Sequence, residues 1–230
     1  PDLQKYNLDF AVPSIAQDIA AGAQTAPNTL FSMILYQMGG SYYNEDFSRS
    51  ILDSDTAIAA FEMWTELFNS YRLPQRVNFV NRFRVGEVPI GIANYTIFNH
   101  LSVFAPEIRG LWGFAPVPGM RREDGSIARH VASSSSASIM IRDNTDKNMS
   151  WEFIKWWTDA PTQIAFGQGM ESVLGISARW PSANREAFEQ IPWTTSEMNQ
   201  IKKQWEWTRG IPEVPGGYFL SRHLDNALRR

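Results

Sequence analysis

The chain contains no cysteine, and this absence removes several kinds of site from consideration. Without thiols there is no disulfide framework, no thiolate zinc site, no iron–sulfur cluster and no cysteine nucleophile. The three histidines, His100, His130 and His223, lie far apart in the sequence and never show the H-x-x-x-H spacing that puts two imidazoles on one metal. We therefore expect no metal site.

Long hydrophobic runs, basic clusters and phosphate-binding loops are missing as well. No apolar run approaches the roughly 18–20 residues that a membrane helix needs. The formal net charge is −3, and no cluster of Lys and Arg could neutralise a run of phosphates, so we expect no nucleic-acid partner. Neither a dinucleotide-binding nor a P-loop glycine pattern occurs, and no G-x-S-x-G nucleophile elbow. We therefore expect no cofactor.

The 230 residues do contain enough apolar material for a large core, and many aromatic side chains. Hydrophobic residues make up 43% of the chain and charged residues 20%, a balance that is typical of folded proteins. There are 9 Trp, 7 Tyr and 14 Phe. Aromatic side chains mostly fill cores, but this number leaves some for a place where a flat ring meets a ligand.

Spacing and capping residues predict a mixture of helices and short strands. Helices are expected over 54–71, 145–158, 162–166, 183–189, 194–208 and 218–228, with Ser182 as one cap, Thr194 and Glu197 as a capping box, and Gly167, Gly169 and Gly210 as helix ends. Buried strands are expected over 88–93, 111–117 and 138–141, with a polar turn over 121–125. Helices interleaved with apolar strands indicate an α/β fold.

Aromatic and polar side chains gather at three places where a predicted element ends. These places are residues 94–98, 175–180 and 212–222. In an α/β fold a ligand lies outside the carboxyl ends of the strands. Flat rings beside Asn, Ser, Thr and Arg suit sugars, because the ring covers the C–H face while the polar groups bond the hydroxyls. The alternative is that the rings of Tyr95, Trp180 and Tyr218 simply close the core.

Paired carboxylates, which a sugar-cleaving enzyme requires, occur only in turns, caps and helix faces. The pairs are Glu45 with Asp46, Asp53 with Asp55, Glu123 with Asp124, and Glu186 with Glu189. None is flanked by the apolar residues that would raise the pKa of a general acid. We therefore expect a protein that is not an enzyme, and keep a carbohydrate-active enzyme or its accessory sugar-binding domain as the alternative.

Seven short motifs spread over nearly the whole chain add information through their order. They are a helix ending in Gly-Gly (28–40), the capped helix (54–71), F-x-x-G and an apolar strand (83–92), P-x-P-G (116–119), a helix pair (151–156 and 163–166), G-x-x-A-R (175–179), and Pro215 with Asn226-Ala227. This order resembles that of the extracellular solute-binding proteins of ABC sugar importers, in the maltose-binding-protein-like branch.

The resemblance implies a periplasmic-binding-protein-like (type II) α/β architecture of two lobes that close by a hinge. It also implies that the chain is N-terminally truncated and consists mainly of the second lobe. Residues 1–128 would form the first part of the second lobe, 129–174 a crossing segment that belongs to the first lobe, and 175–230 the C-terminal helical part of the second lobe. The serine run 133–136 and the loop 173–175 are then the hinge candidates.

The same resemblance implies an extracytoplasmic solute-binding subunit, or a fragment of one, of a bacterial ABC importer. Such a subunit captures an oligosaccharide and delivers it to the membrane permease without breaking bonds. The implied partners are the oligosaccharide and the transmembrane subunits of the ABC permease, and the implied state is a monomer. The implied location is the extracellular face of the bacterial membrane, as a lipid-anchored lipoprotein, or the periplasm.

Carried over to this sequence, the resemblance implies ten ligand-binding residues. They are Tyr42, Asn94, Tyr95, Thr96, Phe98, Ser177, Arg179, Gly217, Tyr218 and Arg222. The family often has Trp at the position of Thr96, so the stacking ring is expected at Tyr95 or Phe98. Arg179 and Arg222 would suit an acidic sugar through bidentate pairing. Their alternative roles are surface ion pairs or charges at a helix C-terminus.

Overall fold

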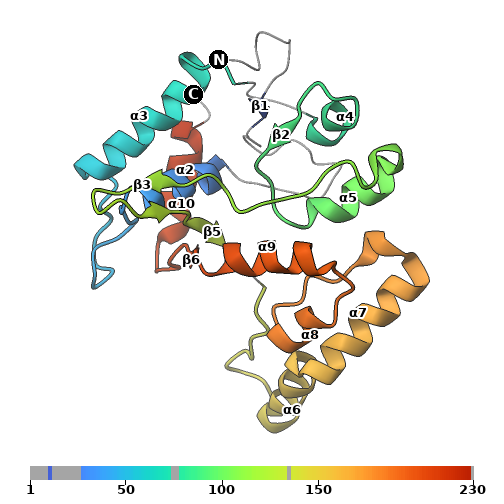
Figure 1. Cartoon of the computed structure of the whole chain (residues 1–230). Coiled ribbons are helices and arrows are strands. Elements are labelled where there is room, and N and C mark those ends of the chain that lie inside the picture. Colours follow the sequence, from blue (N-terminus) through green and yellow to red (C-terminus); the bar gives the residue numbers. More distant parts are fainter. Residues whose placement is uncertain (1–9, 12–26, 74–77, 134–135, 229–230) are drawn as a thin grey trace.

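The main hydrophobic core lies between helices α2 (Pro27–Gln37), α3 (Asp55–Asn69) and α10 (Gly217–Leu228), as the computed structural model in Figure 1 shows. The structure describes residues 10–11, 27–73, 78–133 and 136–228. Every side chain from position 30 to position 37 is buried, which is the pattern of a helix enclosed on all sides. Helix α3 begins at the predicted cap, where the Ser54 hydroxyl accepts a bond from the Ala57 amide, and it buries Ala57, Ala60 and Trp64.

A second, smaller core lies beneath α4 (Phe79–Arg84) and α5 (Ile97–Phe104). Its buried residues are Val80, Leu101 and Ala105, with Phe83, Ile97, Ile108 and Trp112 packed against them. The short 3₁₀ helix η2 (Pro106–Ile108) closes the end of α5. This core supports the first turn of α5, which directly follows residues 94–96.

The described strands are short and form three pairs. Strand β1 (Phe10–Ala11) runs parallel to β2 (Ile90–Gly91), and β5 (Val131–Ser133) runs parallel to β6 (Thr208–Gly210). Strands β3 (Met120–Arg121) and β4 (Ile127–Ala128) are antiparallel and enclose the predicted polar turn, where Gly125 has a φ of 81°. The expected α/β class is confirmed.

The remaining helices form a group between β5 and β6 in the sequence. They are α6 (Lys147–Thr158), α7 (Ala160–Leu174), the 3₁₀ helix η3 (Ile176–Ala178), α8 (Arg185–Glu189) and α9 (Thr195–Trp205). The buried Gln163 ties several of them together: its Oε1 accepts bonds from Trp180 Nε1 at 2.8 Å and Ser182 Oγ at 3.0 Å, and its Nε2 donates to the Trp157 carbonyl at 2.7 Å. Among the helices described, none has the length and apolar character needed to cross a membrane.

Three predicted helix ends are wrong. Helix α7 continues through Gly167 and Gly169 and ends at Gly175, which has a φ of 76°. A Cβ on Gly167 would lie 3.4 Å from the Trp180 Cβ, which is an ordinary van der Waals contact. The N-cap of α8 is Asn184 instead of Ser182. Helix α9 ends at Trp205, and Gly210, the predicted helix end, belongs to strand β6.

The strand predictions are largely wrong. Only Ile90 and Gly91 of the run 88–93 form a strand, and neither 111–117 nor 138–141 is a strand. A strand requires a neighbour, and the apolar run 138–141 is exposed along its length, with Ile139 81% exposed. Residues 134 and 135 of the predicted serine hinge lie outside the described residues.

Candidate functional site

The ten predicted ligand-binding residues fall into two groups. The first group lies where α5 packs against η3, and consists of Asn94, Tyr95, Thr96, Phe98, Ser177 and Arg179. The second group lies where α10 packs near the end of α2, and consists of Tyr42, Gly217, Tyr218 and Arg222. The structure therefore brings together residues that are about 80 positions apart in the first group and about 175 apart in the second.

Tyr95 lies just before α5, and its ring contacts a group of other aromatic rings. Its carbonyl accepts a bond from the Phe98 amide at 3.1 Å. Its ring meets Phe188, Trp193 and Trp205 edge-on at centroid distances of 6.3, 6.3 and 6.4 Å. Burial raises the pKa of the Tyr95 phenol to about 12, so the hydroxyl stays protonated at neutral pH. The neighbouring Asn94 is exposed and free to face a ligand.

The rings of Tyr95 and Trp193, together with the rings in contact with either of them, form a group that we call the aromatic cluster. Its members are Tyr95, Phe98, Phe114, Phe188, Trp193 and Trp205. Trp193 contacts four of the other five, with a centroid distance of 4.8 Å to Phe98. The sequence analysis missed Trp193. Its position directly before the cap Thr194 was the available signal, because an apolar residue there often packs against the helix.

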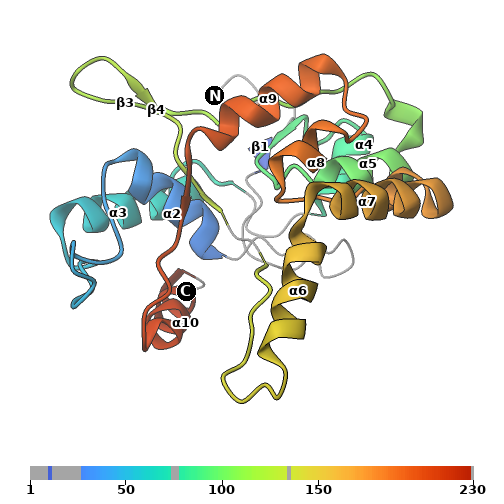
Figure 2. The ribbon, with the colours of Figure 1, turned by 90° about the horizontal axis from the view of Figure 1, so that it is seen from below.

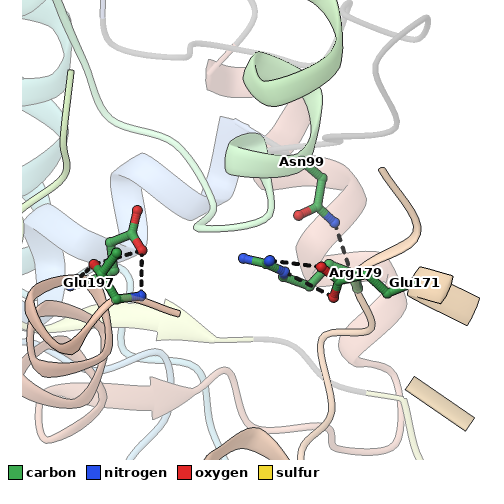
Figure 3. Close-up of polar contacts among 5 residues, drawn as sticks. Asn99, Glu171, Arg179 and Glu197 are labelled. Carbon is green, nitrogen blue, oxygen red and sulfur yellow. Dashed lines mark hydrogen bonds and ion pairs between the residues drawn. The ribbon is translucent and has the colours of Figure 1, made fainter. Parts of the chain in front are cut away.

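Arg179 is buried and already bonded (Figure 3). Its Nε and Nη2 donate to Glu171 Oε2 and Oε1 at 3.2 and 2.8 Å, and its carbonyl accepts a bond from Asn99 Nδ2 at 3.0 Å. The guanidinium carbon lies 5.1 Å from the Phe98 ring centre and 4.7 Å from that of Trp193. The side of the guanidinium expected to meet an acidic sugar is therefore taken by Glu171, and the ion pair is buried instead of lying on the surface.

Ser177 and Thr96 are placed at the edge of this arrangement. Ser177 is exposed, and its hydroxyl donates to the Leu174 carbonyl at 3.0 Å across the turn at Gly175. Thr96 is half-buried at the N-cap of α5, but its side chain makes no capping bond there.

Tyr42 belongs to the main core and does not face an opening. It is 3% exposed, its hydroxyl shares a 2.7 Å hydrogen bond with Ser32, and its ring meets Phe31 and Tyr36 edge-on. Burial raises the pKa of the Tyr42 phenol far above its ordinary value. The chain turns back toward the core after α2, because Gly39 adopts a φ of 85°. Tyr42 thus packs against α2 in the core, and its contact with a ligand stays a prediction.

Tyr218 and Arg222 line an open hollow of about 310 Å³ on α10. Ser221, Asp225 and Asn226 complete its lining, so that a ring, a hydroxyl, a guanidinium, a carboxylate and an amide border one space on the same face of α10. Tyr218 is 70% exposed. Gly217 lies at the start of this helix, where an added Cβ would come 3.5 Å from the Tyr43 hydroxyl. Within the described ranges, no three His, Asp or Glu side chains gather as metal ligands would.

Comparison with known proteins finds its matches among solved structures. No family model matches the chain, and no curated protein matches its sequence. The sugar-binding protein MalE of Xanthomonas citri superposes with a TM-score of 0.69 at 13% identity, covering 97% of this chain and 53% of that one. An ABC transporter solute-binding protein of Thermotoga lettingae, bound with α-D-tagatose, gives 0.63 at 16% identity, covering 99% and 55%. Maltose-bound MalE3 of T. maritima gives 0.62 at 18% identity, covering 99% and 57%.

These likenesses show the fold. The chain has the α/β architecture of part of a type II periplasmic binding protein, as the motif order predicted. It spans a little over half the length of each of these structures. At identities of 13 to 18% the likeness extends to the backbone arrangement, and function has to be argued from the site.

Proposed function

We propose that the chain is the solute-binding subunit, or a fragment of one, of a bacterial ABC importer, and that it captures an oligosaccharide and delivers it to the membrane permease. The supporting observation is the likeness along nearly its whole length to structures named as sugar-binding or solute-binding proteins. A further neighbour is named as a cyclic α-maltosyl-1,6-maltose binding protein. The proposal includes a monomer outside the cytoplasm, in the periplasm or lipid-anchored, that binds by lobe closure and performs no catalysis.

The sugar contacts that we propose are the accessible members of the two groups. Tyr218 offers a ring for the C–H face of a sugar, and Arg222 offers donors for its hydroxyls. Gly217 precedes Tyr218 at the start of the same helix. In the first group, Asn94 and Ser177 are exposed, and Thr96 is half-buried. We propose that the less accessible members of the two groups support the residues that contact the sugar; these members are Tyr95, Phe98, Arg179 and Tyr42.

We also propose that residues 129–174 belong to a first lobe that lies largely outside this chain. Exposed apolar side chains on this segment support the assignment: Ile139, Ile141, Met149, Trp151, Phe153 and Trp156 are each more than half exposed. Helix α6 has no buried residue, and Figure 2 shows it standing away from the remaining helices together with the segment before it. Monomeric proteins rarely leave so much apolar surface in water. Helix α7 packs against η3 and α8 of the segment 175–230, which the proposal leaves in the second lobe.

Calorimetry tests the binding proposal. The chain is titrated with maltose, tagatose and cyclic α-maltosyl-1,6-maltose, and binding to one of these sugars is expected. Tyr218→Ala should weaken that binding about 3- to 10-fold, because it removes a stacking ring. The matched control is Tyr71→Ala, which removes an exposed ring from the end of α3 and should leave binding unchanged. Absence of binding to all three sugars would contradict the proposal, and release of shorter sugars would favour the carbohydrate-active enzyme.

A further inference from the structure

We propose that Arg179 is a positioning residue that fixes the ring of Trp193 against Phe98, and thereby sets the first turn of α5 where Asn94 and Thr96 lie. This inference rests on the proposed function for its effect on sugar binding. Its structural part can be tested without any sugar.

The orientation of Trp193 needs an explanation, because its indole has no polar anchor. Within the part of the chain that the structure describes, the buried Nε1 of Trp193 has no hydrogen-bond partner. The residue lies between α8 and α9, outside any helix or strand, and its amide bonds only to the nearby Ile191 carbonyl. Packing therefore has to hold the ring. The guanidinium of Arg179, 4.7 Å from the ring centre, is the charged group in contact with it.

Arg179 is itself held on three sides. Glu171 on α7 accepts two bonds from the guanidinium, a bidentate geometry that fixes the plane of the fork. Asn99 on α5 donates to the Arg179 carbonyl, and the Arg179 amide donates to the Ile176 carbonyl at 3.2 Å. The Arg179 side chain is 6% exposed and that of Glu171 is 22% exposed, so water weakens the pair only partly. Arg179 is therefore a rigid support for the rings beside it.

The rings transmit this support to α5. The guanidinium touches Phe98 and Trp193 together, and these two rings lie 4.8 Å apart. Trp193 in turn meets Tyr95 at 6.3 Å. Tyr95 and Phe98 bracket the first turn of α5, so movement of Trp193 would shift the backbone that carries Asn94 and Thr96. A lysine cannot substitute, because its ammonium is a compact charge without a flat face to stack.

The central experiment uses Arg179→Lys, which keeps the charge and removes the planar fork. Near-UV circular dichroism and acrylamide quenching report the environment of the indole rings without sugar. The difference between the wild type and Trp193→Phe gives the contribution of Trp193 to these signals. Arg179→Lys should remove most of this contribution while the far-UV spectrum stays native. Affinity for maltose should fall about 5- to 10-fold if the contacts with both rings are lost.

The control is Arg84→Lys, which alters an exposed ion pair with Glu107 and should change neither signal. If Arg179→Lys only lowers the melting temperature, with the Trp193 signal retained, the inference is overturned and the ion pair is merely structural. If the wild-type chain binds none of the three sugars, the proposed function fails separately, and the Trp193 signal still decides the inference. If Arg179→Lys does not fold, Glu171→Gln decides it: a weakened fork should reduce the Trp193 signal, and an unchanged signal would overturn the inference.

Discussion

At the scale of single residues, Tyr95 combines a half-buried side chain with a phenol in a poorly solvated place. Its neighbours in the aromatic cluster are apolar, and burial alone raises the pKa of its phenol to about 12. The unfolded chain exposes the same phenol, which then ionises near pH 10. The folded chain therefore holds a proton that the unfolded chain releases between these two values.

This difference predicts a loss of stability in alkali. Because the folded pKa lies above the unfolded one, the contribution of Tyr95 is fully present below pH 10 and declines until about pH 12. The total loss from this group should be about 2–3 kcal/mol in the free energy of unfolding. Urea unfolding at pH 9, 10 and 11 measures it. Tyr95→Phe should flatten this slope, whereas Tyr218→Phe, which removes an exposed hydroxyl, should not. Equal slopes in wild type and Tyr95→Phe would contradict the prediction.

The same scale shows how far the sequence could predict the site. Tyr42 and Tyr218 both follow glycines and both match the motif order, but one is 3% and the other 70% exposed. The difference arises because Tyr42 meets Ser32 and Tyr36 of α2, contacts that are made only once the chain has turned back at Gly39. Arg179 depends likewise on Glu171 and on the rings of two distant segments. Residue type and local order predict candidates; burial decides between them.

At the scale of elements, helix ends carry much of the local information. Thr194 and Glu197 form the predicted capping box, with the Glu197 amide bonded to Thr194 Oγ1 at 3.2 Å and Glu197 Oε2 accepting from the Thr194 amide at 2.8 Å, as Figure 3 shows in part. The box follows Trp193 directly and so sets where α9 begins relative to the aromatic cluster.

Removing this cap should weaken the chain measurably. Thr194→Ala leaves the first amides of α9 without a partner and should lower the free energy of unfolding by about 1 kcal/mol. Thr195→Ala, one residue further along and exposed, is the control and should change it by less than about 0.5 kcal/mol. Combining Thr194→Ala with Glu197→Ala should lower stability by less than the sum of the two single changes, since both belong to one box. A strictly additive result would argue against the box.

The two kinds of glycine in and after α7 predict opposite effects of the same substitution. Gly175 has a φ of 76°, which alanine adopts only with strain, so Gly175→Ala should destabilise by about 1 kcal/mol. Gly169 is helical and has no atom within 4 Å of an added Cβ, so Gly169→Ala should stabilise by about 0.5–1 kcal/mol. Thermal and urea unfolding measure both. The same sign for both variants would show that α7 ends elsewhere in solution.

Helices were predictable and strands were not, for a physical reason. A helix forms through hydrogen bonds between residues that are close in sequence, so the N-cap residues Ser54 and Thr194 predict where their helices begin. A strand needs a distant partner: β5 pairs residue 131 with residue 208, and β2 pairs residue 90 with residue 10. The end of α7 was wrongly predicted at Gly167, because residue type alone does not show which glycine adopts a positive φ, as Gly175 does with a φ of 76°.

At the scale of the whole molecule, the exposed apolar residues of α6 and of the segment before it form a surface without a covering layer among the described residues. Trp151 and Trp156 are 53% and 56% exposed, and although the Trp156 ring lies near those of Phe153 and Trp157, no residue of α6 is buried. The chain spans a little over half of the structures it resembles, so the missing layer is proposed to be the first lobe.

This proposal predicts that Trp151 and Trp156 contribute little to the stability of the present chain and promote its self-association. Trp151→Gln with Trp156→Gln should change the free energy of unfolding by less than about 1 kcal/mol, because each is a surface substitution here. Self-association in sedimentation velocity and binding of an apolar dye should both fall. The control, Trp180→Gln, removes a ring that packs on Phe166 and donates to Gln163, and should lower stability by about 3 kcal/mol. If the double variant is as unstable as Trp180→Gln, Trp151 and Trp156 are already covered in solution, and α6 belongs to this lobe.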